Sequence, residues 1–460
     1  MEKLIIVGCG AGGVFTALET LELNKDIKIL MIDKGNDITK RVCPKELKGV
    51  CANCKSCSIN SGFGGSGSST DSKMALSSDI GGDVGELIGK DVAENIVQYV
   101  WETYQKFGAK ARVEGVSDRE AINNIRKKAI KSNLKLIEAP LVHLGTEGSR
   151  EIYKRFKDYL VDNGVEILCN TNVVDLIVED GTVKGVIDDK NNVYNADKVV
   201  LALGRQGASF IKDMCSKHGI KNENGRIDIG VRVECRDEVM KEVNDALYEA
   251  KLVGYPPTFK DSCRVFCANP SGFVARENYG DIGVVNGHAY KNKKSNNTNF
   301  AILCSYKFTE PFEDTILYGD SIAKLSNMLG EGEILVQRYG DIISGKRSKQ
   351  KDLEKGNVKP TLKAVAGDIT LALPYRVVVN ILEFIDMLDG VVDGIKSDET
   401  LLYATELKRY SNKINVDDSF ETSIKNLHAI GDCSGWSRNL MMASVSGVHL
   451  ARKIILKQRM

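Results

Sequence analysis

The fold is indicated most clearly by LIIVGCGAGGVFTALETLELNKDIKILMID, residues 4–33. It begins with a short apolar run, passes through a glycine-rich turn at Gly8–Gly13, and continues with apolar residues at helical spacing. A second apolar run follows and ends at Asp33. This order predicts a strand, a helix and a second strand, the unit from which sheets of parallel strands are built.

The glycines of the turn follow the pattern G-x-G-x-x-G, in which each glycine has its own task. Gly8 makes the tight turn, Gly10 lets the backbone approach a pyrophosphate, and Gly13 lets the helix pack closely on the strand. The N-terminus of the helix offers free N–H groups and a positive dipole end to phosphates. Asp33 is placed to accept hydrogen bonds from a ribose hydroxyl. The sequence therefore predicts a Rossmann-like, dinucleotide-binding domain.

The last strand and helix of the chain favour FAD as that dinucleotide. LHAIGD, residues 427–432, predicts a short strand that ends in Gly431 and Asp432, and a helix follows to the end of the chain. This order resembles the second flavin motif of FAD-dependent oxidoreductases. The resemblance implies that Gly431 and Asp432 hold the ribityl chain, while the next helix points its N-terminus at the flavin. The alternative is a simple turn.

The middle of the chain carries a third sign of flavin binding. Residues 165–189 alternate like strands around a hairpin turn at Asp180 and Gly181, and ADKVVLALGR, residues 196–205, predicts a buried strand. This order resembles the β-meander and the following strand of glutathione-reductase-like flavoproteins. The resemblance implies that Gly204 brings the backbone close to the dinucleotide.

A second glycine-rich stretch, GFGGSGSSTDSKM, occupies residues 62–74. No apolar strand precedes it, so it is not a second nucleotide fingerprint. Its composition does not suit the interior of a strand or helix, and its N–H groups could form an anion nest. We expect a loop that contacts the flavin, with a flexible linker as the alternative. The residues expected near the flavin are Gly64, Gly65, Ser68, Asp71 and Lys73.

Four cysteines lie just before this loop, at Cys43, Cys51, Cys54 and Cys57. Thiolates at two-residue gaps can hold a [4Fe–4S] cluster or a tetrahedral zinc ion. An extended link from Cys57 to the glycine loop spans at most roughly 25 Å, which favours a redox role beside the flavin. We expect an iron–sulfur cluster, and structural zinc and free or redox-active thiols remain the alternatives.

Matches to one family run along nearly the whole chain. They are the cysteine cluster, the glycine loop, HLGT at His143, DIGVRVE at Asp228, RVFCANPSGFV at Arg264, VVNGHAY at Val284, KSNNTNFAIL at Lys294, QRYGDIISGKRS at Gln337, LLYATELKRYSN at Leu401 and AIGDCSGWSRNLMMASVSGV at Ala429. Together they resemble a family of FAD-dependent dehydrogenases, glutathione-reductase-like flavoproteins with an N-terminal cysteine cluster. The family's name describes a cofactor more than a reaction, so the resemblance implies an activity without a substrate.

The expected fold is α/β: a Rossmann-like FAD-binding domain of the glutathione-reductase type with a β-meander, plus an inserted α+β substrate or cap domain. The FAD-binding domain should come from three parts of the chain, residues 1–79 with the cysteine cluster, 141–212 and 416–460. A helical insertion is expected at 80–140, and the substrate or cap domain at 213–415.

Flavin chemistry often needs a nearby acid or base, and His288 in NGHAY is the leading candidate proton donor. His143 is a weaker one, because a lone histidine is more often a structural residue. Arg264 is a candidate for clamping a carboxylate or phosphate through two parallel hydrogen bonds. Lys73 in the glycine loop completes the predicted catalytic group.

Composition limits the class of protein further. The 460 residues carry 63 basic and 62 acidic side chains, so there is no electrostatic footprint for nucleic acid or an anionic membrane. No apolar run is long enough to span a membrane, and twelve cysteines scattered through a long chain fit a reducing compartment. We therefore expect a cytoplasmic protein with a small-molecule substrate. The sequence does not set its oligomeric state.

Three functional hypotheses follow. The first is an FAD-dependent oxidoreductase that acts on a small organic substrate, with electrons relayed through a cysteine-ligated cluster from a ferredoxin-like donor. The second is a flavoprotein that modifies RNA, against which the neutral net charge argues. The third is a redox sensor that uses flavin and cluster to change partners. In the latter two, the cysteines would bind structural zinc or serve as a signalling cluster.

Overall fold

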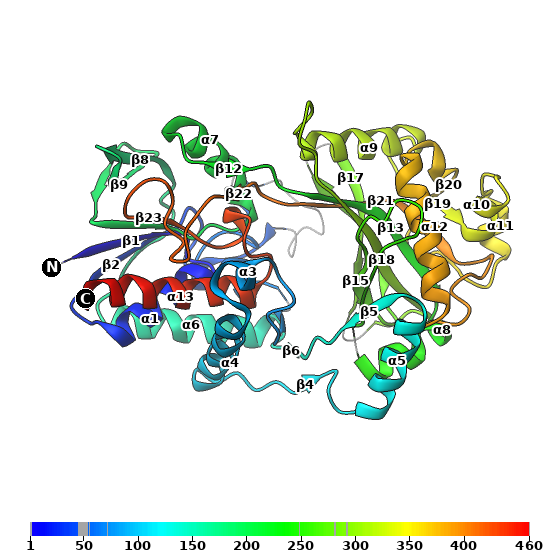
Figure 1. The fold of residues 1–460 in the computed structure, drawn as a ribbon, viewed down its shortest axis with the longest axis horizontal. Coiled ribbons are helices and arrows are strands. Elements are labelled where there is room, and N and C mark those ends of the chain that lie inside the picture. Colours follow the sequence, from blue (N-terminus) through cyan, green and yellow to red (C-terminus); the bar gives the residue numbers. More distant parts are fainter. Residues whose placement is uncertain are drawn as a thin grey trace. The chain divides into compact units, whose positions relative to one another are not determined.

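The computed structural model describes residues 2–44, 54, 56–70, 72–247, 249–279, 282–290 and 293–459. The chain forms two compact units, each assembled from separate segments (Figure 1). The first unit contains residues 1–113, 140–223 and 411–460, and the second contains residues 114–139 and 224–410. Among the described residues, no helix combines the length and the apolar character that a membrane crossing requires.

A five-stranded parallel sheet is the centre of the first unit. Its strand order is β23-β11-β1-β2-β7. The strands are β1 (Lys3–Val7), β2 (Lys28–Ile32), β7 (Glu166–Leu168), β11 (Lys198–Leu201) and β23 (Leu427–Ala429). The central strands are almost entirely apolar and buried, as expected for a sheet covered on both faces. Because all the strands run the same way, their carboxyl ends meet at one edge, where ligands bind in such sheets.

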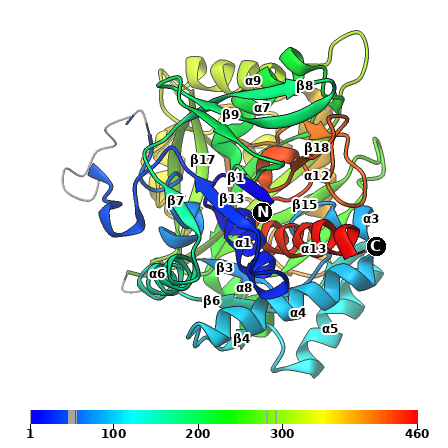
Figure 2. The same ribbon diagram turned by 90° about the vertical axis from the view of Figure 1, so that its left-hand side faces the viewer.

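Helices pack on this sheet through an apolar and aromatic core. Those of the first unit are α1 (Ala11–Leu23), α3 (Val84–Ile88), α4 (Lys90–Lys106), α6 (Thr146–Asp162), α7 (Ala208–His218) and α13 (Leu440–Arg459). Helices α1 and α13 lie side by side in both views (Figures 1 and 2). Their close approach depends on Gly447, where a Cβ atom would overlap the carbonyl oxygen of Gly12. Rings of Phe15, Tyr104 and Phe156 meet at centroid distances of 5.3 to 5.6 Å.

Smaller sheets complete the first unit. Strands β8 (Val173–Glu179), β9 (Thr182–Asp188) and β10 (Val193–Asn195) form a three-stranded antiparallel meander between β7 and β11. Strand β6 (Leu141–His143) lies between β3 (Lys73–Ala75) and β4 (Val113–Glu114), and β12 (Asn222–Glu223) pairs with β22 (Lys413–Ile414). Single turns of 3₁₀ helix are η1 (Ile38–Lys40), η2 (Gly65–Ser68), η3 (Arg205–Gly207) and η5 (Asp432–Ser434).

The second unit is built on an eight-stranded sheet with the order β20-β19-β21-β13-β18-β15-β14-β5. Its strands are β5 (Leu134–Ile137), β13 (Ile227–Arg236), β14 (Lys251–Gly254), β15 (Cys263–Asn269), β18 (Asn297–Tyr306), β19 (Leu335–Arg338), β20 (Val365–Ala366) and β21 (Leu401–Arg409). A separate hairpin pairs β16 (Phe273–Tyr279) with β17 (Ile282–His288). The helices are α5 (Arg119–Lys131), α8 (Asp237–Leu247), α9 (Thr315–Leu329), α10 (Tyr339–Ile343), α11 (Gln350–Lys355), α12 (Tyr375–Asp389) and the 3₁₀ turn η4 (Ile369–Leu371).

Strand β13 buries apolar side chains on one face of this sheet and charged ones on the other. Ile227, Ile229, Val231, Val233 and Cys235 alternate along the strand and join the core of the second unit. The residues between them include Asp228, Arg232 and Glu234, and these are buried as well. Buried charges require partners, so this face is organised by ion pairs and hydrogen bonds.

The innermost of these pairs joins Arg232 on β13 to Glu406 on β21, and both side chains are completely buried. The guanidinium makes a bidentate contact, with Nε 2.7 Å from Oε2 and Nη2 2.6 Å from Oε1. Arg232 Nη1 also donates to the backbone oxygen of Cys267 at 2.9 Å. Burial lowers the pKa of Arg232, but Glu406 raises it by more, so the guanidinium stays charged.

The helical insertion predicted at 80–140 is corrected by the structure, since this segment is divided between the two units. The buried face of α4, which includes Ile96, Val97 and Val100, packs into the core of the first unit. Helix α5 instead places Ile122 and Ile125 in the core of the second unit, and β5 pairs with β14 there. Both helices show the same amphipathic spacing, which does not reveal the core that each one covers.

Candidate flavin site

The carboxyl ends of four neighbouring strands bring the predicted nucleotide-binding residues of the first unit to one edge of its sheet. Gly8 follows β1, Asp33 follows β2, Gly204 lies three residues after β11, and Gly431 lies two residues after β23. Gly8 adopts a φ of +108°, and a Cβ there would lie 2.6 Å from the backbone oxygen of Ala202. The turn after β1 therefore requires glycine, because the end of β11 lies directly against it.

The first glycine loop leads straight into α1. Val14 N donates to Gly10 O at 2.9 Å, so the N–H groups of Ala11, Gly12 and Gly13 have no acceptor inside the helix. No heavy atom of the described chain lies within 4 Å of a Cβ added to Gly10. A Cβ added to Gly13 would instead overlap the carbonyl oxygen of Gly8. Gly10 thus faces open space beside a helix N-terminus, whereas Gly13 serves the packing of helix on strand.

Asp33 ties three backbone segments together. Its carboxylate accepts hydrogen bonds from Cys9 N at 2.9 Å, Gly35 N at 2.8 Å and Gly62 N at 2.8 Å. A carboxylate has about four lone-pair positions, so a ribose hydroxyl could still donate to it. Asp33 therefore also holds the two glycine loops together, a structural role that its spacing after Gly13 does not predict.

The second glycine loop packs against the first. Gly64 N donates to Cys9 O at 2.7 Å, and a Cβ on Gly65 would lie 3.0 Å from the Cα of Gly10. Both Gly64 and Gly65 have positive φ, at +86° and +54°. The loop contains the short turn η2, at whose end Ser68 is buried. Gly65 therefore borders the open space beside Gly10, as a flavin-contacting loop would.

Arg41 fastens this loop, and sequence reasoning missed it. Only 4% of the residue is exposed. Its guanidinium donates to the backbone oxygens of Ser58, Ile59 and Phe63 at 2.7 to 2.9 Å and to Ser68 Oγ at 2.5 Å. Burial lowers the pKa of Arg41 to about 10, although Asp33 nearby favours the charged form. Its acceptors are mostly backbone oxygens, which leave no side-chain pattern in the sequence.

The ends of β11 and β23 contribute Gly204 and Asp432. As at Gly10, a Cβ on Gly204 would meet no described heavy atom within 4 Å. Gly431 has a φ of +76° and approaches Leu203 O. The Asp432 carboxylate accepts from Ser437 Oγ at 3.1 Å and lies 3.8 Å from Arg205 Nε. Burial raises the pKa of Asp432 to about 6, against the opposing effect of Arg205, Ser437 and Arg438.

These residues fit FAD. Gly10 and Gly204 leave open space where an added Cβ would stand, which is the clearance a nucleotide needs to approach the backbone. The free N–H groups and positive dipole end of α1 suit the pyrophosphate. Asp33 and Asp432 supply acceptors for hydroxyl groups at the ends of β2 and β23.

The other predicted site residues lie in different places. Lys73 in β3 pairs directly with His143 in β6, within the first unit. Asp71 lies outside the described residues. Arg264 belongs to the second unit, where it forms an ion pair with buried Asp228 and donates to Tyr410 Oη at 2.9 Å. Asp228 raises the pKa of Arg264, so this guanidinium is committed to an internal partner. His288 is exposed at the end of β17, with its ring 6.3 Å from that of Tyr290.

Three of the four clustered cysteines fall within the described residues. Cys43 and Cys57 are half-buried, and Cys54 is exposed. Cys51 lies outside the described residues. In the part of the chain that the structure does describe, no three cysteine, histidine or acidic side chains gather as a metal ion would require. The predicted metal site includes Cys51, so it lies partly outside the described residues.

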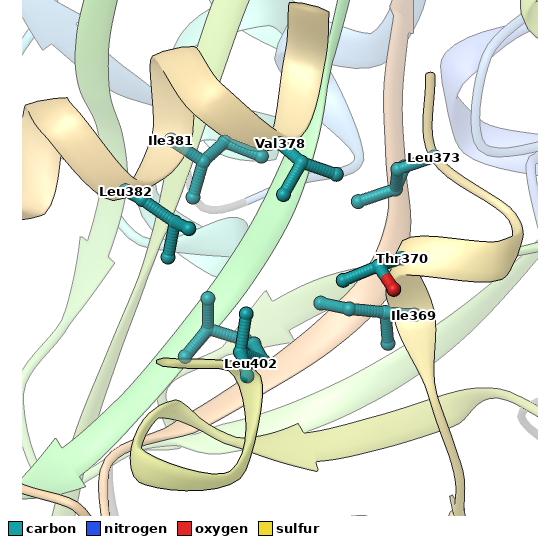
Figure 3. Close-up of a pocket in the computed structure, with 8 residues that line it drawn as sticks. Ile369, Thr370, Leu373, Val378, Ile381, Leu382 and Leu402 are labelled. Carbon is teal, nitrogen blue, oxygen red and sulfur yellow. The ribbon is translucent and has the colours of Figure 1, made fainter. Parts of the chain in front are cut away.

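Two cavities, called here the first and second hollows, are lined by residues of the second unit. The first has a volume of about 10 Å³, near the space of a single water, and Figure 3 shows its apolar lining, including Ile381, Leu373 and Leu402. The second has a volume of about 240 Å³ and is lined by polar and aromatic residues that include Asp261, Tyr306 and Arg376. The first is packing space in the apolar core, whereas the second can admit a small molecule.

Two family models match the chain. The model described as pyridine nucleotide-disulphide oxidoreductase matches residues 121–239, which include the meander and β11. The model described as FAD-dependent protein, C-terminal domain-like, matches residues 226–409. This is nearly all of the longer segment of the second unit, residues 224–410. These matches, together with the strand-end geometry, define an enzyme that binds FAD, an FAD-dependent oxidoreductase.

The chain is also similar to solved structures of low sequence identity. It matches the quinol fumarate reductase FrdA of E. coli at 15% identity with a TM-score of 0.43, over 100% of this chain and 71% of that one. It matches L-proline dehydrogenase from P. horikoshii at 11% identity and 0.41, over 98% and 93%. Glycine oxidase from Bacillus cereus matches at 12% identity and 0.34, over 100% and 96%. No curated protein sequence gives a match.

Proposed function

We propose that this chain oxidises or reduces a small organic substrate with FAD held at the strand ends of the first unit. The observation that carries the proposal is the meeting of Gly10, Gly204 and Asp432 at one edge of a parallel sheet, with open space at both glycines. Such an edge, next to a helix N-terminus, is where doubly wound folds bind nucleotides.

Each part of FAD has its own group of residues in this proposal. The first-turn N–H groups of α1 hold the pyrophosphate, and the open backbone at Gly10 permits its approach. Asp33 accepts from the adenosine ribose, and Gly431 with Asp432 holds the ribityl chain. Gly64 and Gly65 close one side of the site, with Arg41 fixing their loop. When bound, FAD accepts or supplies a hydride.

The chain's own part in the chemistry is the handling of a proton. Because the pKa of Asp432 lies near 6, its carboxyl group populates both protonation states close to neutral pH, and it can take up or release a proton. Arg205 and Arg438 hold it toward the charged form. Lys73 and His143, paired across β3 and β6, are the remaining candidates of the first unit for a polar role.

The proposed reaction at the flavin does not require a relay from a ferredoxin-like donor. Cys43, Cys54 and Cys57 are not gathered as ligands in the described chain, and no step through a cluster follows from their positions. Iron, sulfide and zinc analysis of anaerobically purified protein tests the earlier prediction directly. Four irons and four sulfides per chain would restore the relay, and one zinc would make the cysteines a structural brace.

The function is tested by anaerobic mixing of the FAD-loaded protein with a panel of small amino acids, hydroxy acids and reduced nicotinamides. A compound on which the enzyme acts should bleach the flavin absorption, and Asp432→Asn should slow bleaching and flatten its pH dependence near pH 6. A flavin that no compound of the panel reduces, in protein that binds FAD tightly, would contradict the proposed substrate class. Protein that cannot bind FAD would contradict the site itself.

A further inference from the structure

Two cysteines of the second unit face each other across neighbouring strands. Cys263 is the first residue of β15, and it pairs with Cys304 of β18 in the antiparallel ladder. Their sulfur atoms lie 2.7 Å apart. Both side chains are buried in the core of the unit, and both cysteines are free. The two cysteines are 41 positions apart in the sequence, so only the strand register reveals the pair.

The position within the ladder suits a disulfide. Ser305 N donates to Ser262 O at 3.0 Å, so the neighbouring pair of residues is the hydrogen-bonded one. Paired residues alternate along antiparallel strands, which makes Cys263 and Cys304 a non-hydrogen-bonded pair. Such pairs have their Cα atoms about 4.5 Å apart, within the range of about 4.4 to 6.8 Å that disulfides span. A bond between the two sulfurs therefore needs no movement of the strands.

The second hollow lies near this pair in the chain, although neither cysteine lines it. Its lining includes Ser305 and Tyr306 of β18, which follow Cys304, and Asp261, which lies two residues before Cys263. Tyr306 also interacts with Cys304, while its hydroxyl accepts from Asn380 Nδ2 at 3.1 Å. With a volume of about 240 Å³, the hollow admits a molecule the size of hydrogen peroxide.

We propose that Cys263 and Cys304 are a redox-active pair that a hydroperoxide converts to a disulfide, because the strand register holds their sulfur atoms 2.7 Å apart. One thiol attacks the peroxide oxygen and passes its proton to the leaving oxygen, giving a sulfenic acid and water or an alcohol. The second thiol then attacks the sulfenic sulfur, and one water leaves as the S–S bond forms. Two thiols lose two electrons and two protons, and the hydroperoxide takes them up. This modification site is independent of the flavin site and of the proposed function.

Other buried cysteines provide the contrast. Cys235 on β13 is also buried in the core of the second unit, and its thiol lies 3.9 Å from the backbone oxygen of Thr298. Its register partner on β18 is Thr298, so the ladder offers it no thiol. A general reaction of buried thiols with oxidant would modify Cys235 as well, whereas the proposed reaction leaves it alone.

The experiment is peptide mapping of the native, FAD-loaded protein before and after treatment with hydrogen peroxide, followed by blocking of free thiols under denaturing conditions. Trypsin releases Cys263 in the peptide of residues 261–264 and Cys304 in that of residues 295–307. We expect these peptides to be joined after oxidation, with a mass two hydrogens below their sum, and to separate on reduction. Cys235 should be alkylated to the same extent with and without peroxide treatment.

Matched variants separate this outcome from damage. Cys235→Ser should leave the joined peptides unchanged, while Cys263→Ser should leave Cys304 without its partner and remove them. If the native protein keeps both Cys263 and Cys304 alkylatable after peroxide, or joins either one to another cysteine instead, the proposal is overturned. The mapping of the unsubstituted protein decides this even if a serine variant does not fold.

Discussion

Replacing Gly10 with valine should remove tight FAD binding and leave the fold of the first unit in place. Gly10 has φ and ψ of −76° and −172°, which a β-branched residue adopts without strain. A Cβ at this position would meet no described heavy atom within 4 Å, but valine is a poorer N-cap than glycine, so the protein without flavin should lose about 1 kcal/mol of stability. The added methyl groups would stand where the backbone must meet a pyrophosphate.

The size of the effect follows from the N–H groups at the start of α1. Each hydrogen bond from such a group to a charged phosphate is worth about 1.5 to 3 kcal/mol. Losing two of them corresponds to an FAD affinity lower by about 10²- to 10⁴-fold. The assay is a fluorescence titration of flavin-free protein with FAD, paired with thermal unfolding of the same sample.

Two further glycines serve as controls. Gly148 lies in α6 with open space at its Cβ, so Gly148→Ala should keep FAD affinity unchanged and gain about 0.5 to 1 kcal/mol of stability. Gly13→Ala should lower stability and FAD content together, because its Cβ would overlap Gly8 O. Two results would contradict the role given to Gly10: Gly10→Val binds FAD as tightly as the unsubstituted protein, or it loses as much thermal stability as Gly13→Ala.

Three other perturbations test the energetics. The pKa of Asp432 rises from 3.8 in the unfolded chain to about 6 in the fold, so the contribution of this group to stability is most favourable below pH 4 and falls as pH rises through 6. Because the side chain is only 19% exposed, Asp432→Asn should raise the free energy of unfolding of flavin-free protein by up to about 3 kcal/mol at pH 8 and leave it unchanged at pH 3.5, as measured by urea unfolding. Glu406→Gln should cost about 3 to 5 kcal/mol because it leaves Arg232 charged and buried, whereas Glu406→Leu combined with Arg232→Met should cost clearly less; equal costs in denaturant unfolding would contradict the pairing. Arg41→Met should cost about 3 kcal/mol and weaken FAD binding by freeing the second glycine loop, and unchanged affinity in the titration would speak against that loop's contact with the flavin.

Local patterns predicted the residues that the chain's own turns require. Gly8, Gly13 and Gly431 occupy positions where a side chain would overlap backbone or the backbone is left-handed, and their spacing after apolar runs was enough to find them. The parallel strands β1, β2, β11 and β23 were found in the same way, because buried strands read as continuous apolar runs.

Long-range contacts were beyond the reach of such patterns. Arg41 binds backbone oxygens 17 to 22 residues away, and Arg232 meets Glu406 across 174 residues, so neither leaves a periodic signal. Arg264 was predicted to bind a substrate, yet its partner is buried Asp228, a choice that only the register of the sheet reveals. The division of residues 80–140 between the two units escaped detection for the same reason, since an amphipathic helix does not specify the core it covers.

The most direct test of the central claim is the flavin content of the purified protein, measured by absorption before and after denaturation releases the cofactor. We expect one FAD per chain in the folded protein, or the same ratio after flavin-free protein is loaded with FAD. Folded protein that neither carries flavin nor binds added FAD would contradict the assignment of the strand-end glycines and of Asp432 to a flavin site.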